Sequence, residues 1–175
     1  MARIPLPGPE AMTPEQRRIY DEVMAGPRGS FMGPLRAVIH WPELAEHWQK
    51  LGALVRFRTE FPPRLSELAI LVTARAWDSQ FEWFAHEPIA RKAGLAEDTI
   101  AAIRERRRPS LTDADEQAVY DFAAEMHDTH TVSEPTYARA LERFGTLGVV
   151  QLTALLGYYT MVAMTLNAHD IPVPP

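Results

Sequence analysis

The chain has 175 residues, a formal net charge of −5 at pH 7 with both signs interspersed, and no cysteine. This length predicts one domain, because about 150 residues already bury roughly 68–70% of the surface of an unfolded chain. The charge offers nucleic acid and anionic membranes no general attraction, and the absence of cysteine excludes disulfides, thiolate metal sites and thiol nucleophiles. The first residues are interrupted by prolines and do not form a signal peptide, so we expect a cytoplasmic protein.

The elements predicted along the chain are helices, with almost no strand pattern. Thr13 is an N-cap residue, with Pro14 and Gln16 completing a helix start, and this first helix runs to about Ala25. Further helices are predicted, after a short apolar turn ending near His40, over residues 42–60, 65–77, 79–94, 96–107, 112–128, 133–144 and 146–168, with Thr112 and Ser133 as N-caps and Gly145 as a break. The pattern indicates an all-α fold in a single domain over residues 1–175, with residues 1–12 and 170–175 as extended tails.

The last predicted helix raises the question of a membrane span. Residues 147–167 contain no charged side chain over a length that could cross a bilayer. Gln151, Thr160 and two tyrosines make the segment too polar for a lone span, and no basic residue follows it. We therefore expect a helix that is buried on several sides and lies in a subunit interface, where Tyr158 and Tyr159 supply contact area with a polar group.

Ionisable residues occupy positions in the middle of the chain where a core is expected. Glu67 lies in a helix that is apolar nearly all round, and Ser79, Glu82 and His86 follow at helical spacing in the next helix. Burying a carboxylic acid or an imidazole costs about 2 kcal/mol or more unless the group finds a partner. Such a cluster is therefore either a satisfied hydrogen-bond network or a reactive site.

Helical geometry places several of these residues on one face. At about 100° per residue, Ser79, Glu82, Trp83 and His86 lie within one stripe, which we expect to meet another helix. Glu82 and His86 are four residues apart, so a hydrogen bond between them would fix one tautomer or hold an imidazolium. Glu67 also points toward packed protein, where a carboxyl has the raised pKa of a general acid or base.

A structural interpretation competes with the catalytic one for each residue. Ser79 and Glu82 also form the Ser-x-x-Glu pattern of a capping box, in which both side chains bind backbone amides at a helix start. His86 alone is typical of a hydrogen-bonded core histidine. Glu67 could cap a neighbouring helix or pair with Arg75 or another arginine.

A longer pattern includes these residues and extends over most of the chain. It comprises Glu67, Ser79-x-x-Glu82-x-x-x-His86, Ala90, Gly94-Leu95, the segment Phe81-Glu82-Trp83-x-x-His86-Glu87-Pro88-Ile89-Ala90, the His40-x-Pro42 turn and Gly157-Tyr158-Tyr159. This pattern resembles the carboxymuconolactone decarboxylase and alkylhydroperoxidase D-like superfamily. The resemblance implies a helical bundle of the alkylhydroperoxidase D-like type that assembles into homo-oligomers, commonly trimers or hexamers.

The resemblance also assigns roles to individual positions. In the hydroperoxidase branch a glutamate, two cysteines and a histidine form a thiol relay, and these positions are Glu67, Ser79, Glu82 and His86 here. Both cysteines are replaced, and a hydroxyl and a carboxylate cannot form the disulfide that peroxide reduction needs. The decarboxylase branch carries the Glu-x-x-x-His pattern that this chain keeps, and its chemistry on a lactone acid needs no cofactor.

The resulting prediction is a cofactor-independent acid/base lyase of small carboxylated or lactone compounds. His86 is the predicted proton-transfer residue, oriented by Glu82, with Glu67 as a second acid/base and Trp83 as a pocket wall. Ser79 and Tyr158 are further candidates for substrate binding. A hydrolase or isomerase on the same scaffold and a non-catalytic oligomeric binding protein remain alternatives.

Two other patterns carry weaker signals. His127-x-x-His130 has a spacing found in metal sites, but no third ligand accompanies it in a known order, so we expect no metal there. The arginines of residues 104–108 close a predicted helix, and a solvated face that complements the helix dipole is the expected role. We therefore predict no bound metal, no cofactor and no nucleic-acid or membrane partner.

Overall fold

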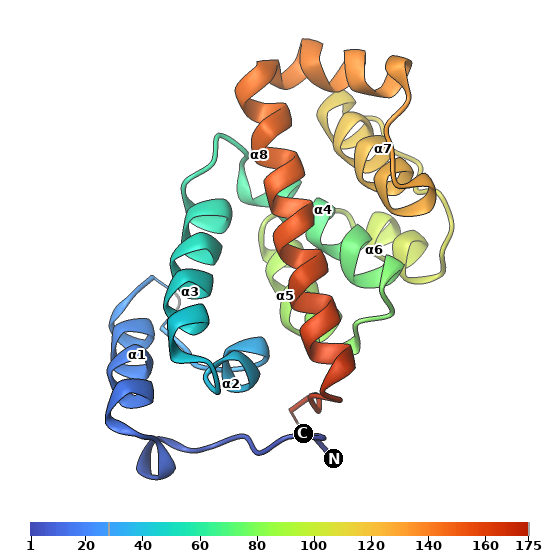
Figure 1. The fold of residues 1–175 in the computed structure, drawn as a ribbon. Helices are drawn as coiled ribbons and strands as arrows, with labels where there is room; N and C mark the ends of the chain where they lie inside the picture. Colours follow the sequence, from blue (N-terminus) through green and yellow to red (C-terminus); the bar gives the residue numbers. More distant parts are fainter. Residues whose placement is uncertain (28, 175) are drawn as a thin grey trace.

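The computed structural model describes residues 1–27 and 29–174, and the elements in these residues are all helical (Figure 1). They are a short 3-10 helix, η1 (Pro9–Ala11), and the α-helices α1 (Pro14–Ala25), α2 (Pro34–Val38), α3 (Pro42–Phe57), α4 (Pro63–Ala76), α5 (Gln80–Lys92), α6 (Glu97–Arg104), α7 (Ala114–Thr129) and α8 (Glu134–Ala168). The all-α fold predicted from the sequence is confirmed. Each predicted helix is present, with ends that differ by a few residues.

The N-terminal cap of α1 lies at the predicted residue, and the cap of α7 lies one residue after the predicted one. At α1 the capping box forms as expected, because the Thr13 hydroxyl accepts from the Gln16 amide and the Gln16 side chain accepts from the Thr13 amide. At α7 the cap is Asp113 and not Thr112. The Asp113 carboxylate accepts from two backbone amides, at 2.8 and 3.0 Å, which a threonine hydroxyl does less well.

The α8 helix consists of two pieces that meet at Gly145. This glycine has φ 63° and ψ 179°, a backbone conformation outside the helical region that is essentially restricted to glycine. Figure 1 shows the chain changing direction there, so that the first piece lies beside α7 and the second runs across the molecule. The predicted helix break at Gly145 is therefore confirmed.

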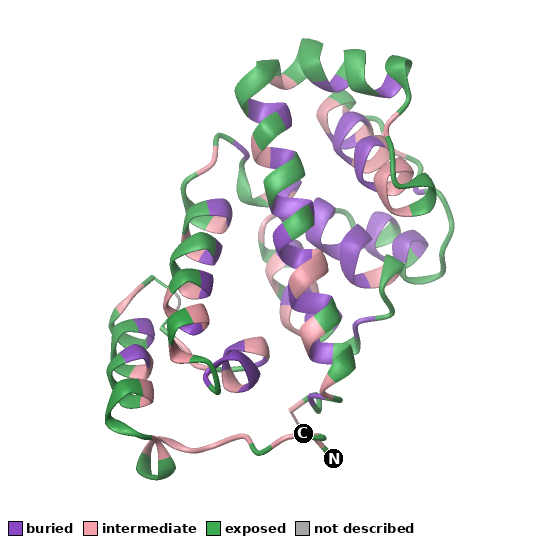
Figure 2. Cartoon of the chain, in the orientation of Figure 1, coloured by how far each residue is buried: buried purple, intermediate pink, exposed green. Residues whose placement is uncertain are grey.

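The core is built around α4. Every residue from Leu65 to Ala74 is buried, including Glu67, because α5, α7 and α8 all pack against this helix (Figure 2). A helix that is apolar on nearly all sides needs neighbours on all sides, which explains its central place. On α3, Trp48 and Val55 are buried against the core, whereas Leu51, also at core spacing, is exposed.

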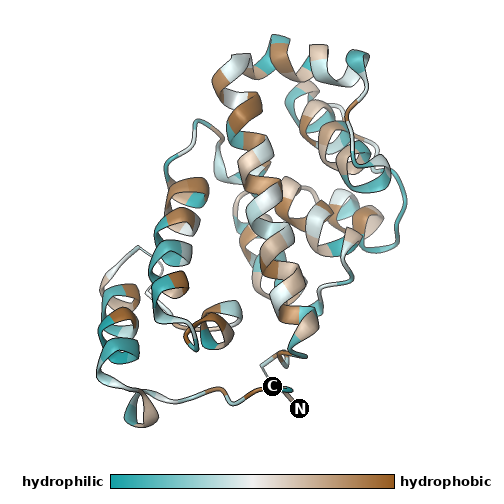
Figure 3. Cartoon of the chain, in the orientation of Figure 1, coloured by the Kyte–Doolittle hydropathy of each residue, from teal (hydrophilic) through white to brown (hydrophobic). Residues whose placement is uncertain are grey.

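Apolar residues recur along the whole length of α8 (Figure 3). It is the single helix within residues 1–27 and 29–174 that is long and apolar enough to cross a membrane, with a mean hydropathy of 1.5 over its most apolar window. Half of that window is buried against the rest of the protein, as for the core helix of a globular domain. Tyr158 and Tyr159, expected in a subunit interface, are buried within this chain.

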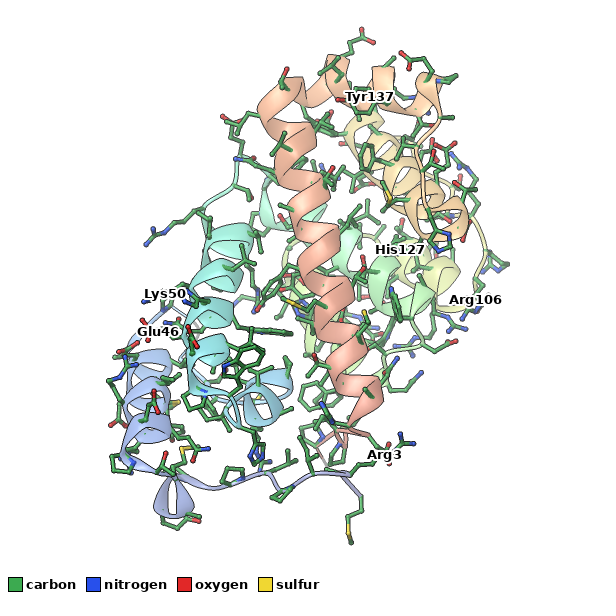
Figure 4. The ribbon with its side chains drawn as sticks, viewed as in Figure 1. Arg3, Glu46, Lys50, Arg106, His127 and Tyr137 are labelled. Carbon is green, nitrogen blue, oxygen red and sulfur yellow. The ribbon has the colours of Figure 1, made fainter. Side chains whose placement is uncertain are left out.

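The two ends of the described chain meet. The Arg3 amide donates to the His169 carbonyl at 2.9 Å, and the Arg3 guanidinium donates to Ala168 O at 3.3 Å (Figures 1 and 4). The predicted tail over residues 1–12 is extended except for η1. The predicted tail over residues 170–175 is described to residue 174, and its last residue, Pro175, lies outside the described residues.

Candidate active site

The centre of the candidate site is a buried pair between α4 and α5. His86 Nδ1 lies 2.7 Å from Glu67 Oε2, and the two residues are 7% and 4% exposed. The Arg56 guanidinium on α3 lies 3.9 Å from the other carboxylate oxygen of Glu67 and forms an ion pair with it. A carboxylate oxygen accepts hydrogen bonds, so Nδ1 is the ring nitrogen that donates in this pair.

Two consecutive tyrosines of α8 border the imidazole. The Tyr159 ring meets His86 edge-on, with centroids 5.0 Å apart and planes at 89°. Tyr158 contacts Tyr159 in the same manner at 5.4 Å and packs against Trp48 at 5.7 Å. These contacts restrict the ring planes, because edge-to-face pairs are favoured over a face-to-face sandwich. The imidazole is therefore held both by a hydrogen bond and by packing.

His86 lies on the wall of a small cavity between α2, α5 and α8. The cavity has a volume of about 90 Å³. Its lining is Ser30, Met32, Pro34, Leu35, Arg56, Phe81, Glu82, Ala85, His86, Tyr158, Tyr159, Val162 and Leu166. The ionisable groups of this lining are one guanidinium, one carboxyl, one imidazole and two phenols, in otherwise apolar surroundings. Glu67 is not part of the wall and lies behind His86.

Glu82 is the most unusual residue of the cavity. It is 1% exposed, and neither of its carboxyl oxygens has a hydrogen-bond partner among the described residues. Burial away from water raises the pKa of Glu82 well above its usual range, because the charged form is not solvated there. Burial therefore favours the uncharged acid at Glu82, a form that can donate a proton or a hydrogen bond.

The expected hydrogen bond between Glu82 and His86 is not formed. Both side chains do line the same cavity, as their spacing of four residues predicted. The imidazole Nδ1 instead lies 2.7 Å from Glu67 Oε2 on the neighbouring helix α4, and the other carboxylate oxygen of Glu67 lies 3.9 Å from the Arg56 guanidinium. Glu67 therefore orients His86, which is the role that the sequence pattern gave to Glu82.

The capping box that was the alternative interpretation of Ser79 and Glu82 is not formed. Ser79 is the N-cap residue of α5, but its side chain makes no capping hydrogen bond, and its hydroxyl has no partner within the described part of the chain. The Ser79 amide already donates to the Ala74 carbonyl at 2.8 Å, so the Glu82 side chain has no amide to bind there. Glu82 extends into the cavity instead.

Ser79 and Trp83 lie on a different pocket from the other candidates. This second pocket has a volume of about 540 Å³, and Arg104 and Glu87 also line it. The Trp83 ring nitrogen donates to Glu87 at 2.9 Å, and the Arg104 guanidinium lies 5.1 Å from the ring centroid. Trp83 follows Glu82 by one residue and thus about 100° around the helix, which turns it away from the small cavity.

The structure thus gathers Glu82, His86 and Tyr158 on one cavity, with Glu67 directly behind. Sequence reasoning missed Arg56 and Tyr159. Arg56 lies eight residues after Trp48, on the same face of α3, so a charged residue on a core-facing stripe was the available signal. Nothing in the sequence indicated that this stripe faces α4 at Glu67, because that contact depends on the packing of distant helices.

The role of His127, which the sequence pattern singled out, is a hydrogen bond between α7 and α4 (Figure 4). The Thr73 hydroxyl uses its one proton toward the Ala69 carbonyl, at 2.9 Å, so His127 Nε2 must donate to the Thr73 oxygen, also at 2.9 Å. Burial lowers the pKa of His127, which keeps the ring neutral. Throughout the described residues, no group of three or more His, Cys, Asp or Glu is arranged to hold a metal ion.

Comparison with known proteins supports the resemblance given by the site residues. Residues 42–125, from α3 into α7, match the sequence model of the Carboxymuconolactone decarboxylase family. This segment contains Glu67, Ser79, Glu82 and His86, so the similarity that the sequence pattern indicated is confirmed, in a chain without the redox cysteines. No curated protein matches the chain.

Solved structures match the fold over nearly the whole chain. An uncharacterised peroxidase-related protein with an alkylhydroperoxidase AhpD core, from Ralstonia eutropha JMP134, has a TM-score of 0.80 at 16% identity and covers 99% of this chain and 92% of that one. A peroxidase-related protein from Silicibacter sp. TM1040 gives 0.79 at 15%, covering 98% and 91%. The debrominase Bmp8 in complex with 2,3,4-tribromopyrrole gives 0.77 at 13%, also covering 98% and 91%. The bundle is therefore of the AhpD type.

Proposed function

We propose that this chain, with the fold of the carboxymuconolactone decarboxylase and AhpD-like superfamily, is a cofactor-independent acid/base lyase. It acts as a decarboxylase on a small carboxylated or lactone compound. The observation that supports this most is the pairing of a neutral acid, Glu82, with an oriented imidazole, His86, on one small cavity. An imidazole can transfer the proton while a neutral carboxyl donates a hydrogen bond to developing charge, so the two groups are suited to separate roles.

The proposed reaction breaks the bond between a carbon and its carboxylate. The electron pair of that bond moves into a conjugated carbonyl, carbon dioxide leaves, and a proton is added to the carbon, so that R–CO2⁻ and H⁺ give R–H and CO2. His86 Nε2 delivers the proton, and Glu67 stabilises the charged imidazole at Nδ1. The neutral Glu82 carboxyl donates a hydrogen bond to the oxygen on which enolate-like charge develops.

Apolar surroundings contribute to the same reaction. Phe81, Ala85 and Val162 line the cavity beside the polar groups, so water around a bound acid is largely displaced. A carboxylate is poorly stabilised there, while the more diffuse charge of the transition state is stabilised by fixed donors. A thiol peroxidase relay is excluded because the sequence contains no cysteine.

We also propose that the protein is a cytoplasmic homo-oligomer in which α8 contacts a second copy. A stripe of apolar and small residues at spacings of three and four follows the outer face of α8: Leu147, Val150, Ala154, Gly157, Met161 and Met164. Leu147 and Val150 are 55% and 61% exposed, which is unusual for side chains of this size in a regular series. Size-exclusion chromatography with light scattering tests this, and a monomer at micromolar concentration would contradict it.

Turnover provides the test of the enzymatic proposal. Purified protein without added metal or cofactor is expected to release carbon dioxide from 4-carboxymuconolactone or a related lactone acid. His86→Ala is expected to abolish release without unfolding the protein. His127→Ala is the matched control, because it removes a second partly buried imidazole that lies outside the cavity. No release across a panel of such acids would overturn the decarboxylase proposal.

A further inference from the structure

A larger pocket lies where the two tails of the chain meet, and we call it the tail pocket. Its volume is about 570 Å³, whereas the small cavity has about 90 Å³. Ordinary ligand pockets span roughly 300–1,000 Å³, so the tail pocket alone has the size of a ligand site. Residues 6–9 of the N-terminal tail and residues 171–174 of the C-terminal tail line it, together with parts of α1, α2 and α5. Figure 1 shows both tails at the end of the molecule where α2 lies.

Hydrogen bonds hold the tails in place around the tail pocket. The Arg36 guanidinium on α2 donates to the Leu6 carbonyl at 2.6 Å. The Arg3 amide, bonded to the His169 carbonyl, joins the N-terminal tail to the end of α8, from which the C-terminal tail continues. A pocket with fixed walls loses little conformational freedom when a ligand binds, which favours affinity.

The tail pocket adjoins the small cavity at two side chains. Met32 and Phe81 line both spaces. The Phe81 ring is held against the backbone of Gly33, since a Cβ at that glycine would lie 2.8 Å from the ring. Met32 is 47% exposed and unbranched, so it can change rotamer without disturbing its neighbours. One molecule can therefore reach from the tail pocket past Met32 into the small cavity.

The side chains of the tail pocket define what kind of group fits. Three aromatic rings, of Tyr20, Phe31 and Phe81, and four prolines are among its lining residues. The Tyr20 and Phe31 rings meet edge-on, with centroids 5.1 Å apart. Arg36 is the one charged side chain of the lining within the described residues, and no carboxylate of that lining could pair with a cation. A flat apolar ring without positive charge is therefore the group that this surface accommodates best.

Almost the whole lining lies outside the segment that matches the family. That segment is residues 42–125, and Phe81 is the single residue of the tail pocket within it, among the residues that the structure describes. The small cavity, by contrast, takes Arg56, Glu82 and His86 from the matched segment. The reactive groups thus come from the shared part of the chain, while the ends of the chain form a surface that can give this protein its own substrate preference.

We propose that the tail pocket binds an apolar ring of the substrate while the carboxylated end of the same molecule occupies the small cavity. This inference rests on the proposed decarboxylase function. The substrate class is a small carboxylated ring or lactone that carries a second, apolar ring such as phenyl. Contacts with that second ring, remote from the bond that breaks, hold the carboxylated end beside Glu82 and His86.

Binding without turnover tests the tail pocket directly. The probes are 2-furoate, a five-membered ring with one carboxylate, and 5-phenyl-2-furoate, which adds one apolar ring, each titrated into the purified protein by calorimetry. Wild-type protein is expected to bind 5-phenyl-2-furoate more tightly than 2-furoate by a factor of about ten or more, because the phenyl ring buries apolar area. Phe31→Ala is expected to remove most of this preference, and Phe31→Leu to retain part of it, since leucine keeps an apolar wall without the ring.

Leu6→Ala is a second variant, at a wall in the N-terminal tail. It leaves in place the backbone carbonyl to which Arg36 donates. The variant is expected to bind 5-phenyl-2-furoate about threefold or more weakly than wild type, because it removes apolar contact area. Binding of 2-furoate by the same variants shows that their fold and the small cavity are intact.

Tyr137→Ala is the matched control. It removes an aromatic ring that is 41% exposed, lies at the other end of the molecule from Arg3 (Figure 4) and lines neither pocket. Its affinity for both probes is expected to stay within about twofold of wild type, as for a distant, independent site. The proposal is overturned if wild-type protein binds the two probes equally, if it binds neither at millimolar concentration, or if Tyr137→Ala reduces the preference as much as Phe31→Ala does.

Turnover separates this inference from the function on which it rests. Among lactone acids that release carbon dioxide, a phenyl-bearing member is expected to have a kcat/KM about tenfold or more above that of its unsubstituted parent, and Phe31→Ala to remove this advantage. Binding of 5-phenyl-2-furoate that depends on Phe31, with no carbon dioxide from any acid, refutes the decarboxylase and leaves the tail pocket. Carbon dioxide release with the same kcat/KM for phenyl-bearing and unsubstituted acids refutes the tail pocket and leaves the decarboxylase.

Discussion

His86 Nδ1 and Glu67 Oε2 are 2.7 Å apart although the residues are 19 positions apart in the sequence, so one hydrogen bond joins the two helices of the candidate site. The bond is almost completely shielded from water, since both residues are less than a tenth exposed. A charge-assisted hydrogen bond in such surroundings is stronger than the same bond at the surface. It sets both the tautomer and the direction of the imidazole.

Glu67→Gln is predicted to reduce kcat by about 10²- to 10⁴-fold, the usual contribution of a positioned acid/base. The amide keeps the volume of the carboxyl but cannot stabilise a charged imidazole at Nδ1. The measurement is carbon dioxide release as a function of pH, in which the variant loses the rise that the imidazole produces. Glu97→Gln, at a carboxylate 66% exposed, serves as control, and a loss of less than twofold in Glu67→Gln would contradict the assigned role.

Glu82→Gln is predicted to stabilise the protein at pH 7 and above. Burial raises the pKa of Glu82 in the folded state, so between its unfolded and folded pKa values the unfolded chain has released a proton that the folded protein retains. The contribution of Glu82 to the free energy of unfolding is fully present below its unfolded pKa of about 4.5. It falls above that pH by about 1.4 kcal/mol per pH unit, the slope for one proton.

The measurement for Glu82 is the free energy of unfolding of both proteins from pH 4 to pH 8 by urea denaturation. The difference between them should grow with pH in favour of the glutamine variant. Glu46→Gln gives the opposite sign, because hydrogen bonds from Lys50 and Arg18 lower the pKa of Glu46 to about 2, and its contribution is lost only as pH falls (Figure 4). A pH-independent difference for Glu82→Gln would show that Glu82 is ionised.

Ser79→Ala is predicted to leave the free energy of unfolding unchanged or to raise it. A buried hydroxyl without a partner costs about 1–3 kcal/mol, and alanine removes it. A capping residue behaves differently: Thr13→Ala, at a cap that is formed, should lower stability by about 1 kcal/mol. Chemical denaturation of the two variants compares them, and a similar loss for both would restore the capping box at Ser79.

Gly145→Ala is predicted to lower the free energy of unfolding by about 1–3 kcal/mol. No atom lies close to an added Cβ, so the cost comes from the positive φ of 63° that alanine rarely adopts. Gly157→Ala lies in the regular part of the same helix with open space around it in the single chain, so in the dissociated monomer it should gain about 0.4–1 kcal/mol. Thermal and urea unfolding measure both, and equal effects would contradict the conformational explanation.

Local signals gave the correct helices, whereas contacts between distant helices decided the site. The cap at Thr13 and the break at Gly145 depend on backbone geometry within a few residues, and both were predicted. At Ser79 the local pattern favoured a capping box, but a backbone bond to Ala74 and the space in the cavity overruled it. The partner of His86 and the position of Arg56 depend on how α3, α4 and α5 pack, which no short pattern encodes.

The chain of rings from Trp48 through Tyr158 and Tyr159 to His86 gives the protein a built-in optical reporter. Indole emission is sensitive to small changes in its surroundings, and Trp48 is 3% exposed with its ring nitrogen unpaired among the described residues. No tryptophan lines the small cavity, but Trp48 contacts Tyr158, which does; the other three tryptophans are Trp41, Trp77 and Trp83. Replacing them with phenylalanine leaves one fluorophore, whose spectrum follows occupancy of the cavity in real time.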